Sequence, residues 1–242
     1  EALRAALADE SVAAFFFEPV QGKGVIPHPP GILREVAEIC RETGTLLVAD
    51  LHLGKAETYR SLGVPMPEGI AEESLERLEL AIDRSGAASV IVLGDLVHCE
   101  EGMEDPVIEL MARWRRRVSL PMSLIGGNHD AAVSIPRSWR IEDDGAERRL
   151  GPFRLQHHPR PTDAAFDAGD PVVLAGHLHP VLSLGEGARR VLAHAFVVEP
   201  GQMILPAFTP FARGARFRPE PDRGRRIFAI GRASCRERVF RA

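Results

Sequence analysis

Five short motifs in this chain bring together residue types that bind metal ions. In chain order they are Asp50-Leu-His52, Gly94-Asp95-Leu-Val-His98, Gly127-Asn128-His129-Asp130, His157-His158 and Gly176-His177-Leu-His179. Carboxylate, imidazole and amide oxygen suit Mn²⁺, Fe or Zn²⁺ better than a thiolate-dominated site would. Each motif alone is a weak signal, because Asp and Asn also occupy turns and caps. Five ordered motifs of one chemical kind are not explained by independent capping, and together they predict a metal centre.

The motifs contain enough ligands for two divalent metal ions. Ions held about 3.5 to 4 Å apart need a shared ligand, and a carboxylate can bridge them, so Asp95 is the predicted bridge. The other predicted ligands divide into two sets, which are Asp50, His52 and His179 for one ion and Asn128, His157 and His177 for the other. Such a pair can activate a bridging water as hydroxide and stabilise the charge of in-line displacement at phosphorus.

His129 lies beside a predicted ligand and is not itself needed as one. Its imidazole is a candidate to protonate a leaving oxygen or to stabilise a transition state, and Asp130 is a candidate to orient that imidazole. His157 and His158 are adjacent, and a shift of one residue in a strand changes the face that a side chain occupies, so both remain candidate ligands. His98 has two interpretations of equal weight, a pocket-lining residue and a residue bonded to the backbone.

Each of the five motifs follows a stretch of residues typical of a buried strand. These stretches are Thr45 to Ala49, Ser89 to Leu93, Met122 to Ile125, Phe153 to Gln156 and Val172 to Ala175. Helices are expected at Gly69 to Arg84 and Pro106 to Arg117, and an earlier helix is expected to bury Val36 and Cys40. Alternating strands and helices predict an α/β fold, and open α/β sheets bind ligands outside the carboxyl ends of their strands.

Composition limits the functional classes. The 242 residues are 45% hydrophobic and 26% charged, as in ordinary globular proteins. A net charge of −4 gives no overall attraction to nucleic acid or to anionic membranes. The three cysteines are widely spaced, which argues against a disulfide framework and favours a reducing, cytoplasmic location. The apolar runs are shorter than the roughly 20 residues that a membrane helix needs, so no membrane association is expected.

The five motifs, in this order, resemble the pattern of the calcineurin-like metallophosphoesterase superfamily, Asp-x-His, Gly-Asp, Gly-Asn-His-Asp/Glu, His and Gly-His-x-His. Three further segments are similar to the ligase-associated DNA damage response endonuclease family, namely Leu47-Val-Ala-Asp-Leu-His-Leu-Gly-Lys55, Val64-Pro-Met-Pro67 and Leu205-Pro-Ala-Phe208. This resemblance aligns His157 with the histidine of the family's His-Glu-Pro segment and places His158 where the family has Glu.

The resemblance covers about residues 45–230 and implies a four-layer αββα sandwich, here expected to lack its native first strands. It also implies two divalent metal ions, with Mn²⁺ favoured, and hydrolysis of phosphate esters. The resemblance alone leads us to expect DNA as substrate, a role in DNA repair, and association with a DNA ligase and a helicase. The residues expected to carry this chemistry are the seven predicted ligands, together with His129 and Asp130.

The N-terminal residues resemble a different family, the class III pyridoxal-phosphate aminotransferases. The similar segments are Phe17-Glu-Pro-Val-Gln-Gly22, Pro29-Pro-Gly-Ile-Leu-Arg-Glu35 and Leu46-Leu-Val-Ala-Asp50. Independently of this resemblance, the apolar and aromatic residues Ser11 to Phe17 predict a buried strand. Pyridoxal phosphate needs a lysine for its Schiff base. Lys23 and Lys55 are the only lysines, and neither occupies the position that the resemblance requires. The alternative function, an aminotransferase fragment, is therefore expected to be inactive.

The sequence predicts three parts with different origins. Residues 1–44 are a foreign, aminotransferase-like segment, and residues 45–229 are the metallophosphoesterase domain. Residues 230–242 are an artefactual tail, because Ile230-Gly-Arg-Ala-Ser-Cys-Arg-Glu-Arg-Val239 resembles one translated frame of a sequencing-adapter oligonucleotide.

Overall fold

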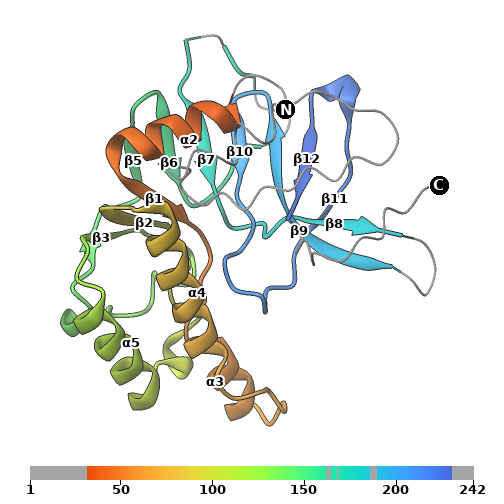
Figure 1. Ribbon diagram of the computed structural model, residues 1–242. Helices are drawn as coiled ribbons and strands as arrows, with labels where there is room; N and C mark the ends of the chain where they lie inside the picture. The colour runs from red at the N-terminus through yellow and green to blue at the C-terminus, as the bar shows by residue number, and fades with distance from the viewer. Residues whose placement is uncertain (1–31, 162–164, 168, 186–189, 231–242) are drawn as a thin grey trace.

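The computed structural model describes residues 32–161, 165–167, 169–185 and 190–230 (Figure 1). The strand expected at Ser11 to Phe17 and all but the first residue of the expected tail lie outside these ranges. No helix in the described ranges is long and apolar enough to cross a membrane.

The first sheet has four strands in the order β1-β2-β3-β4, and all of its neighbouring pairs are parallel. Its strands are β1 (Thr45–Val48), β2 (Ser89–Leu93), β3 (Met122–Ile125) and β4 (Glu142–Asp143). Side chains alternate between the two faces, so that Leu46 and Val48 contact one core cluster while Leu47 and Ala49 contact another. Burial on both faces explains why β1, β2 and β3 are mostly apolar, whereas the exposed edge strand β4 is charged.

Helices cover one face of this sheet. They are α4 (Ile70–Ser85) and α5 (Asp105–Arg117), and the shorter α3 (Lys55–Ser61) lies beyond them (Figure 1). The inward face of α4 buries Leu75, Leu78 and Ile82, as the periodicity predicted, and α5 buries Trp114. The observed bounds of α4 and α5 differ from the predicted ones by one residue at most at each end.

The second sheet is mixed and has eight strands in the order β11-β8-β9-β10-β7-β6-β5, with β12 paired to β9. Its bounds are β5 (Glu147–Leu150), β6 (Phe153–Gln156), β7 (Val172–Ala175), β8 (Val181–Leu184), β9 (Val191–Glu199), β10 (Gln202–Ile204), β11 (Arg216–Phe217) and β12 (Arg226–Ala229). Single 3-10 turns occur at Glu100–Gly102, Arg137–Trp139 and Pro221–Arg223.

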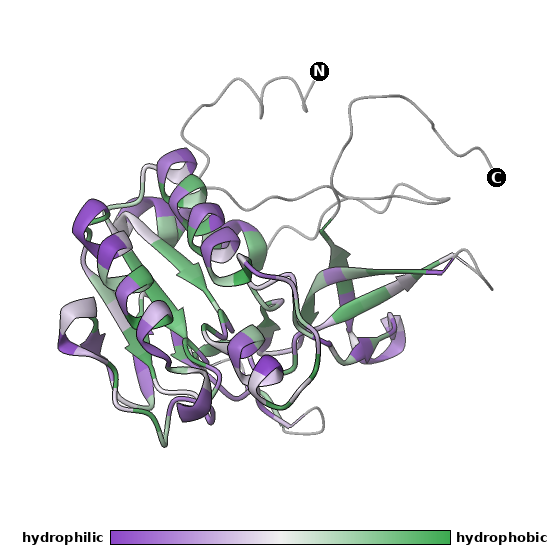
Figure 2. Ribbon diagram, turned by 90° about the horizontal axis from the view of Figure 1, so that it is seen from below, coloured by the Kyte–Doolittle hydropathy of each residue, from purple (hydrophilic) through white to green (hydrophobic). Residues whose placement is uncertain are grey.

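The two sheets share one apolar core. Leu93 of the first sheet and Phe153, Leu174 and Met203 of the second belong to the same buried cluster. Helix α2 (Ile32–Thr43) adds Val36 and Cys40 to that cluster. In Figure 2 the strands are predominantly hydrophobic, whereas the helices carry hydrophilic residues outward. The predicted α/β sandwich of two facing sheets with helices packed on it is confirmed.

Candidate metal centre

Backbone strain in the described part of the chain is concentrated at the predicted ligands. Six non-glycine residues there have positive φ, and five of them are the predicted ligands Asp50 (56°), His52 (50°), Asp95 (51°), His177 (70°) and His179 (47°). A left-handed conformation costs a residue with a side chain roughly 1–2 kcal/mol, and it persists only where the surroundings enforce it. The carboxyl ends of β1, β2 and β7 therefore turn sharply in order to aim these side chains.

Short backbone hydrogen bonds hold the strand ends together. The amide of Asp50 donates to the carbonyl of Gly94 (3.1 Å), and that of His52 donates to the carbonyl of Asp95 (2.9 Å). Gly94 must lack a side chain, because a Cβ there would lie 2.1 Å from Nδ1 of His157. The strand ends can therefore approach closely enough for side chains from both sheets to meet.

The two carboxylate oxygens of Asp95 face different groups of residues. Oδ1 lies 3.4 Å from Nε2 of His157 and accepts a hydrogen bond from the amide of His129 (3.0 Å). Oδ2 lies 3.8 Å from Nε2 of His52. A buried carboxylate that points one oxygen toward each histidine group has the geometry of a bridging ligand.

The first group contains four predicted ligands. One ligand atom from each of Asp50, His52, Asp95 and His179 lies within 4.8 Å of all the others. Nε2 of His52 lies 3.1 Å from Nε2 of His179, which in turn lies 3.4 Å from Oδ1 of Asp50. Two imidazole nitrogens and two carboxylates that converge on one point fit a divalent cation, because a cation satisfies both nitrogens at once.

The second group centres on His157. Its Nε2 lies 3.0 Å from Oδ1 of Asn128 and 3.1 Å from Nδ1 of His177. Its Nδ1 faces the carbonyl of Leu93 at 2.9 Å, which places the proton on Nδ1 and leaves Nε2 free as a ligand atom. The exposed ring of His158 packs against His177 with 4.4 Å between centroids, so that ring is a neighbour of this group.

Local electrostatics favour the protonation states that bind metal at Asp95 and His52. At His157 burial lowers the pKa, but the contact with Asp95 outweighs burial and raises it. Burial raises the pKa of Asp95, but hydrogen bonding and charge from His157 outweigh it and hold the pKa well below its usual range. Burial and the positive charge of Lys55 lower the pKa of His52 far below that of an ordinary histidine. Ionised carboxylates and neutral imidazoles are the forms that coordinate cations.

Two neighbouring residues have contacts that sequence reasoning did not anticipate. Asp130 was expected to orient His129, but its carboxylate instead accepts hydrogen bonds from the amides of Val97 (3.1 Å) and Gly127 (2.9 Å). The His129 imidazole is held by the carbonyl of His98, which lies 2.5 Å from its Nδ1. Asp130 therefore fixes the two loops that bear the ligands, because backbone amides occupy both of its oxygens.

His98 also contacts a predicted ligand directly. Its Nδ1 lies 3.4 Å from Nδ1 of His52, the ring nitrogen that points away from His179. Partners of this kind fix the orientation of metal-binding imidazoles. The position of His98 at the end of a Gly-Asp-x-x-His motif was the available sequence signal, and the structure adds its contacts to both His52 and His129.

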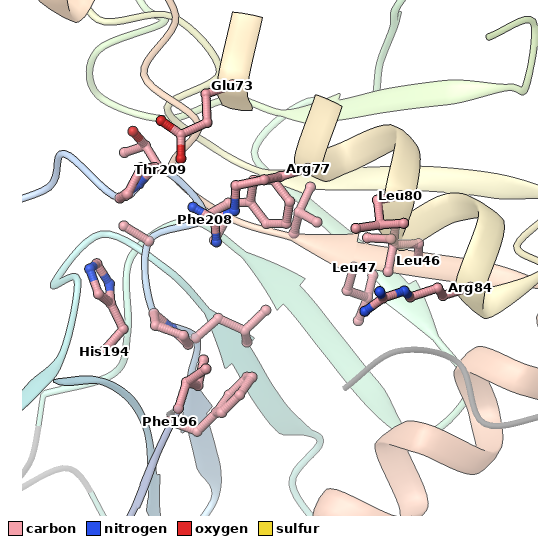
Figure 3. A pocket seen from close by; sticks show the side chains of 18 residues that line it. Leu46, Leu47, Glu73, Arg77, Leu80, Arg84, His194, Phe196, Phe208 and Thr209 are labelled. Carbon is pink, nitrogen blue, oxygen red and sulfur yellow. The ribbon is translucent and has the colours of Figure 1, made fainter. Parts of the chain in front are cut away.

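A separate apolar pocket of about 550 Å³ lies alongside β1 (Figure 3). Its walls include Leu46 and Leu47 of β1, Arg77 of α4, His194 of β9 and Phe208. The side chains around it are mostly apolar, and Glu73, Arg77 and Thr209 are among its polar members (Figure 3). Among the described residues, none of the histidine and carboxylate groups that could hold a metal lies in this lining.

Comparison with known protein families gives two separate matches. Residues 45–187 match the family model described as calcineurin-like phosphoesterase, and residues 1–51 match the model described as aminotransferase class-III. The first match contains all seven predicted metal ligands. The second includes α2, whose residues pack in the core between the two sheets.

Among solved structures, the chain is similar to the nuclease MPE of Pseudomonas putida. The two are 33% identical, the TM-score is 0.64, and the match covers 78% of this chain and 86% of the nuclease.

Among curated proteins, the N-terminal segment is similar to aminotransferases. It is 53% identical over 51 residues to aminotransferase PigE of a Serratia species, which covers 21% of this chain and 6% of that protein. It is 52% identical over 60 residues to acetylornithine aminotransferase of Rhodobacter capsulatus, which covers 24% of this chain and 15% of that enzyme. The chain thus spans only a small part of the aminotransferases that it matches.

Proposed function

The chain belongs to the calcineurin-like phosphoesterase family, and we propose that it hydrolyses phosphodiesters at the metal centre where β1, β2, β3, β6 and β7 end. The observation that carries this proposal is the position of Asp95, whose two oxygens face two different histidine groups. We assign Asp50, His52, Asp95 and His179 to one cation and Asp95, Asn128, His157 and His177 to the other. Mn²⁺ is the proposed metal, and Fe and Zn²⁺ are compatible with the same donors.

Two bound cations would supply activation of water and stabilisation of charge on the phosphoryl oxygens. The chain's own residues prepare the site for this chemistry. Buried Asp50 accepts the amide of His177 at 3.0 Å, which fixes the loop bearing His177 and His179. His129 donates its Nδ1 proton to the carbonyl of His98, so Nε2 is the nitrogen that exchanges a proton with the leaving oxygen.

We further propose that the substrate is DNA. Support comes from the similarity to the P. putida nuclease, which extends over 86% of that protein. As part of the same proposal, the chain takes part in DNA repair together with a DNA ligase and a helicase. The net charge of −4 indicates that any attraction to DNA is local to the site and not a property of the whole surface.

The test begins with protein stripped of metal by a chelator and assayed with bis(p-nitrophenyl) phosphate. Turnover is expected to be absent after stripping and to return when Mn²⁺ is restored. An inactive protein after restoration of Mn²⁺, Zn²⁺ and Fe²⁺ in turn would refute the proposed function.

The adjacent histidines provide a matched pair of variants for this assay. His157→Ala removes the nitrogen that faces both Asp95 and Asn128, and it is expected to lower metal-dependent turnover at least about 100-fold. His158→Ala removes an exposed ring of the same chemistry and is expected to change turnover much less. The reverse ranking would transfer the ligand role to His158.

A further inference from the structure

Three rings form a column that leads away from the metal centre. The rings of His129 and His98 are nearly parallel, with an interplanar angle of 22° and 4.8 Å between centroids. The ring of Tyr59 continues the column at 23° to His98 and 6.1 Å from it. His129 itself lies edge-on to the predicted ligand His52, 4.9 Å away. The column therefore connects the metal centre to the surface of α3.

Core packing does not account for Tyr59. Its side chain is 37% exposed, and within the described part of the chain its hydroxyl makes no hydrogen bond. By contrast, Trp114 and Trp139 are buried. Tyr59 is the only tyrosine in the sequence. An exposed flat ring beside a catalytic centre is available for stacking with a ligand.

The support beneath this ring is rigid. Helix α3 packs against the turn at Glu100–Gly102, where a Cβ on Gly102 would lie 2.2 Å from the carbonyl oxygen of Gly54. Thr58 donates its hydroxyl to the carbonyl of Gly54 (2.9 Å) and lies 3.1 Å from Sγ of Cys99. This close contact between α3 and the turn fixes the direction in which Tyr59 presents its outer face.

A cation lies one helical turn before Tyr59. Lys55 precedes it by four residues, so both side chains occupy the same side of α3. The amide of Lys55 donates to the carbonyl of the predicted ligand His52 (3.2 Å), so this end of α3 adjoins the metal centre. The face thus places an ammonium group next to the metal centre and an aromatic ring farther out. A nucleotide has the same order of groups, an anionic phosphate followed by a flat base.

We propose that Tyr59 stacks on the nucleobase next to the scissile phosphate and that Lys55 binds the phosphate joined to it. This inference rests on the proposed phosphodiesterase function and specifies its substrate as nucleic acid with an unpaired base. Stacking of a base on an aromatic side chain is worth about 1–3 kcal/mol and is tolerant of sequence. Tyr59 is therefore a specificity-determining residue that acts on nucleic acid and not on small diesters.

The kinetic test compares two variants on two substrates. Tyr59→Ala is expected to raise KM for a single-stranded oligonucleotide about tenfold, with little change in kcat. The same variant is expected to change KM much less for an abasic oligonucleotide of equal length, because that substrate offers no base to stack. Tyr59→Phe keeps the ring and is expected to retain the wild-type KM for the oligonucleotide. Leu62→Ala, at a neighbouring side chain that is 72% exposed, controls for general changes at this surface.

A binding test uses the single tyrosine directly. Protein labelled with 3-fluorotyrosine should give one ¹⁹F resonance, recorded with a chelator so that no cleavage occurs. Addition of oligothymidylate is expected to shift this resonance, whereas an abasic oligonucleotide of equal length and charge should leave it nearly unchanged. Equal shifts with both ligands, or a response to duplex DNA alone, would overturn the proposal.

The two proposals can fail separately. A wild-type protein without metal-dependent turnover refutes the phosphodiesterase function, yet the ¹⁹F measurement still decides whether Tyr59 stacks on a base. Active wild-type protein with the same oligonucleotide KM in Tyr59→Ala and Tyr59→Phe refutes the stacking role alone. Thermal melting of each variant shows whether it has folded.

Discussion

Strand β1 contributes to both the apolar pocket and the metal centre, which differ in almost every physical respect. Residues Leu46 to Ala49 line the pocket, and Asp50 and His52, which follow directly, enter the metal centre. The pocket has an ordinary backbone over β1 and mostly apolar walls. The metal centre has positive φ angles, buried carboxylates and imidazole nitrogens about 3 Å apart.

This difference shows that the volume of a cavity is a poor guide to chemistry in this fold. The pocket has a volume of about 550 Å³, but none of the histidine and carboxylate groups that could hold a metal in the described part of the chain lies in its lining. At the metal centre, strained backbone and close approach of like donors each cost free energy in the metal-free chain. Such costs indicate function when several of them occur at one site.

The largest predicted effect concerns the bridging carboxylate. Asp95→Asn keeps the size of the side chain and removes its negative charge, and it is expected to reduce metal-dependent turnover at least about 1,000-fold. The reason is that each oxygen of Asp95 faces a separate histidine group, so one substitution weakens both metal sites. Steady-state assay with saturating Mn²⁺ measures the loss, and circular dichroism shows whether the fold is retained.

A folded Asp95→Asn variant with more than about a tenth of wild-type turnover would contradict the bridging role of Asp95, because the metal centre would then tolerate loss of its central charge. Metal content measured by atomic absorption sharpens the result. Wild-type protein is expected to retain two ions and the variant fewer.

The next prediction applies to the pocket. Ala81 on α4 lines it, and Ala81→Leu places apolar atoms into an empty apolar space with little change in helix propensity. The expected result is a gain of about 1 kcal/mol, seen as a rise of about 2–4 °C in melting temperature, with unchanged turnover.

Ala71 on the same helix supplies the matched control. Ala71 is buried in the filled core against the first sheet, so Ala71→Leu is expected to destabilise the protein by about 1–3 kcal/mol. If both substitutions destabilise equally, the pocket is not an empty space that a side chain can fill.

The parallel strands and the metal ligands at their ends could be predicted from the sequence, because both depend on short-range patterns. An apolar run followed by a polar residue marks the end of a buried strand, and this rule located β1, β2, β3, β6 and β7 together with the residues that follow them. The carboxyl ends of such strands meet at one edge, so the proximity of Asp50, Asp95 and Asn128 followed from the topology.

Other features depend on contacts between distant residues and have no local signal. The roles of Asp130 and His98 depend on which backbone amides and carbonyls lie within reach after folding. Helix α3 is held by its contact with the turn at Glu100–Gly102, where Gly102 approaches Gly54 across a separation of 48 residues in the chain. Strand β8 has one buried residue among four, and β9 begins with exposed residues, so neither is buried along its whole length as the parallel strands β1 and β3 are. Strand β10 is fully buried but is only three residues long.

The smallest predicted effect compares histidines in the two regions. His194 lines the pocket, its Nδ1 is buried without a hydrogen-bond partner in the described part of the chain, and burial together with Arg77 and His179 lowers its pKa. Because the unfolded chain binds a proton near the ordinary pKa of 6.5 and the folded chain resists it, folding stability should fall as pH drops below 6.5. His194→Leu should make this fall shallower, as measured by urea unfolding of chelated protein at pH 7 and pH 5.

The metal centre provides the control for this last measurement. His52 and His177 also have lowered pKa values and should weaken the chelated wild-type protein toward pH 5, whereas the raised pKa of His157 opposes that loss. Bound Mn²⁺ opposes protonation of its ligands, and His194 is not one of them. The difference between His194→Leu and wild type in the stability lost from pH 7 to pH 5 should therefore persist when Mn²⁺ is added. If Mn²⁺ removes that difference, His194 is linked to metal binding, and the pocket and the metal centre act as one site.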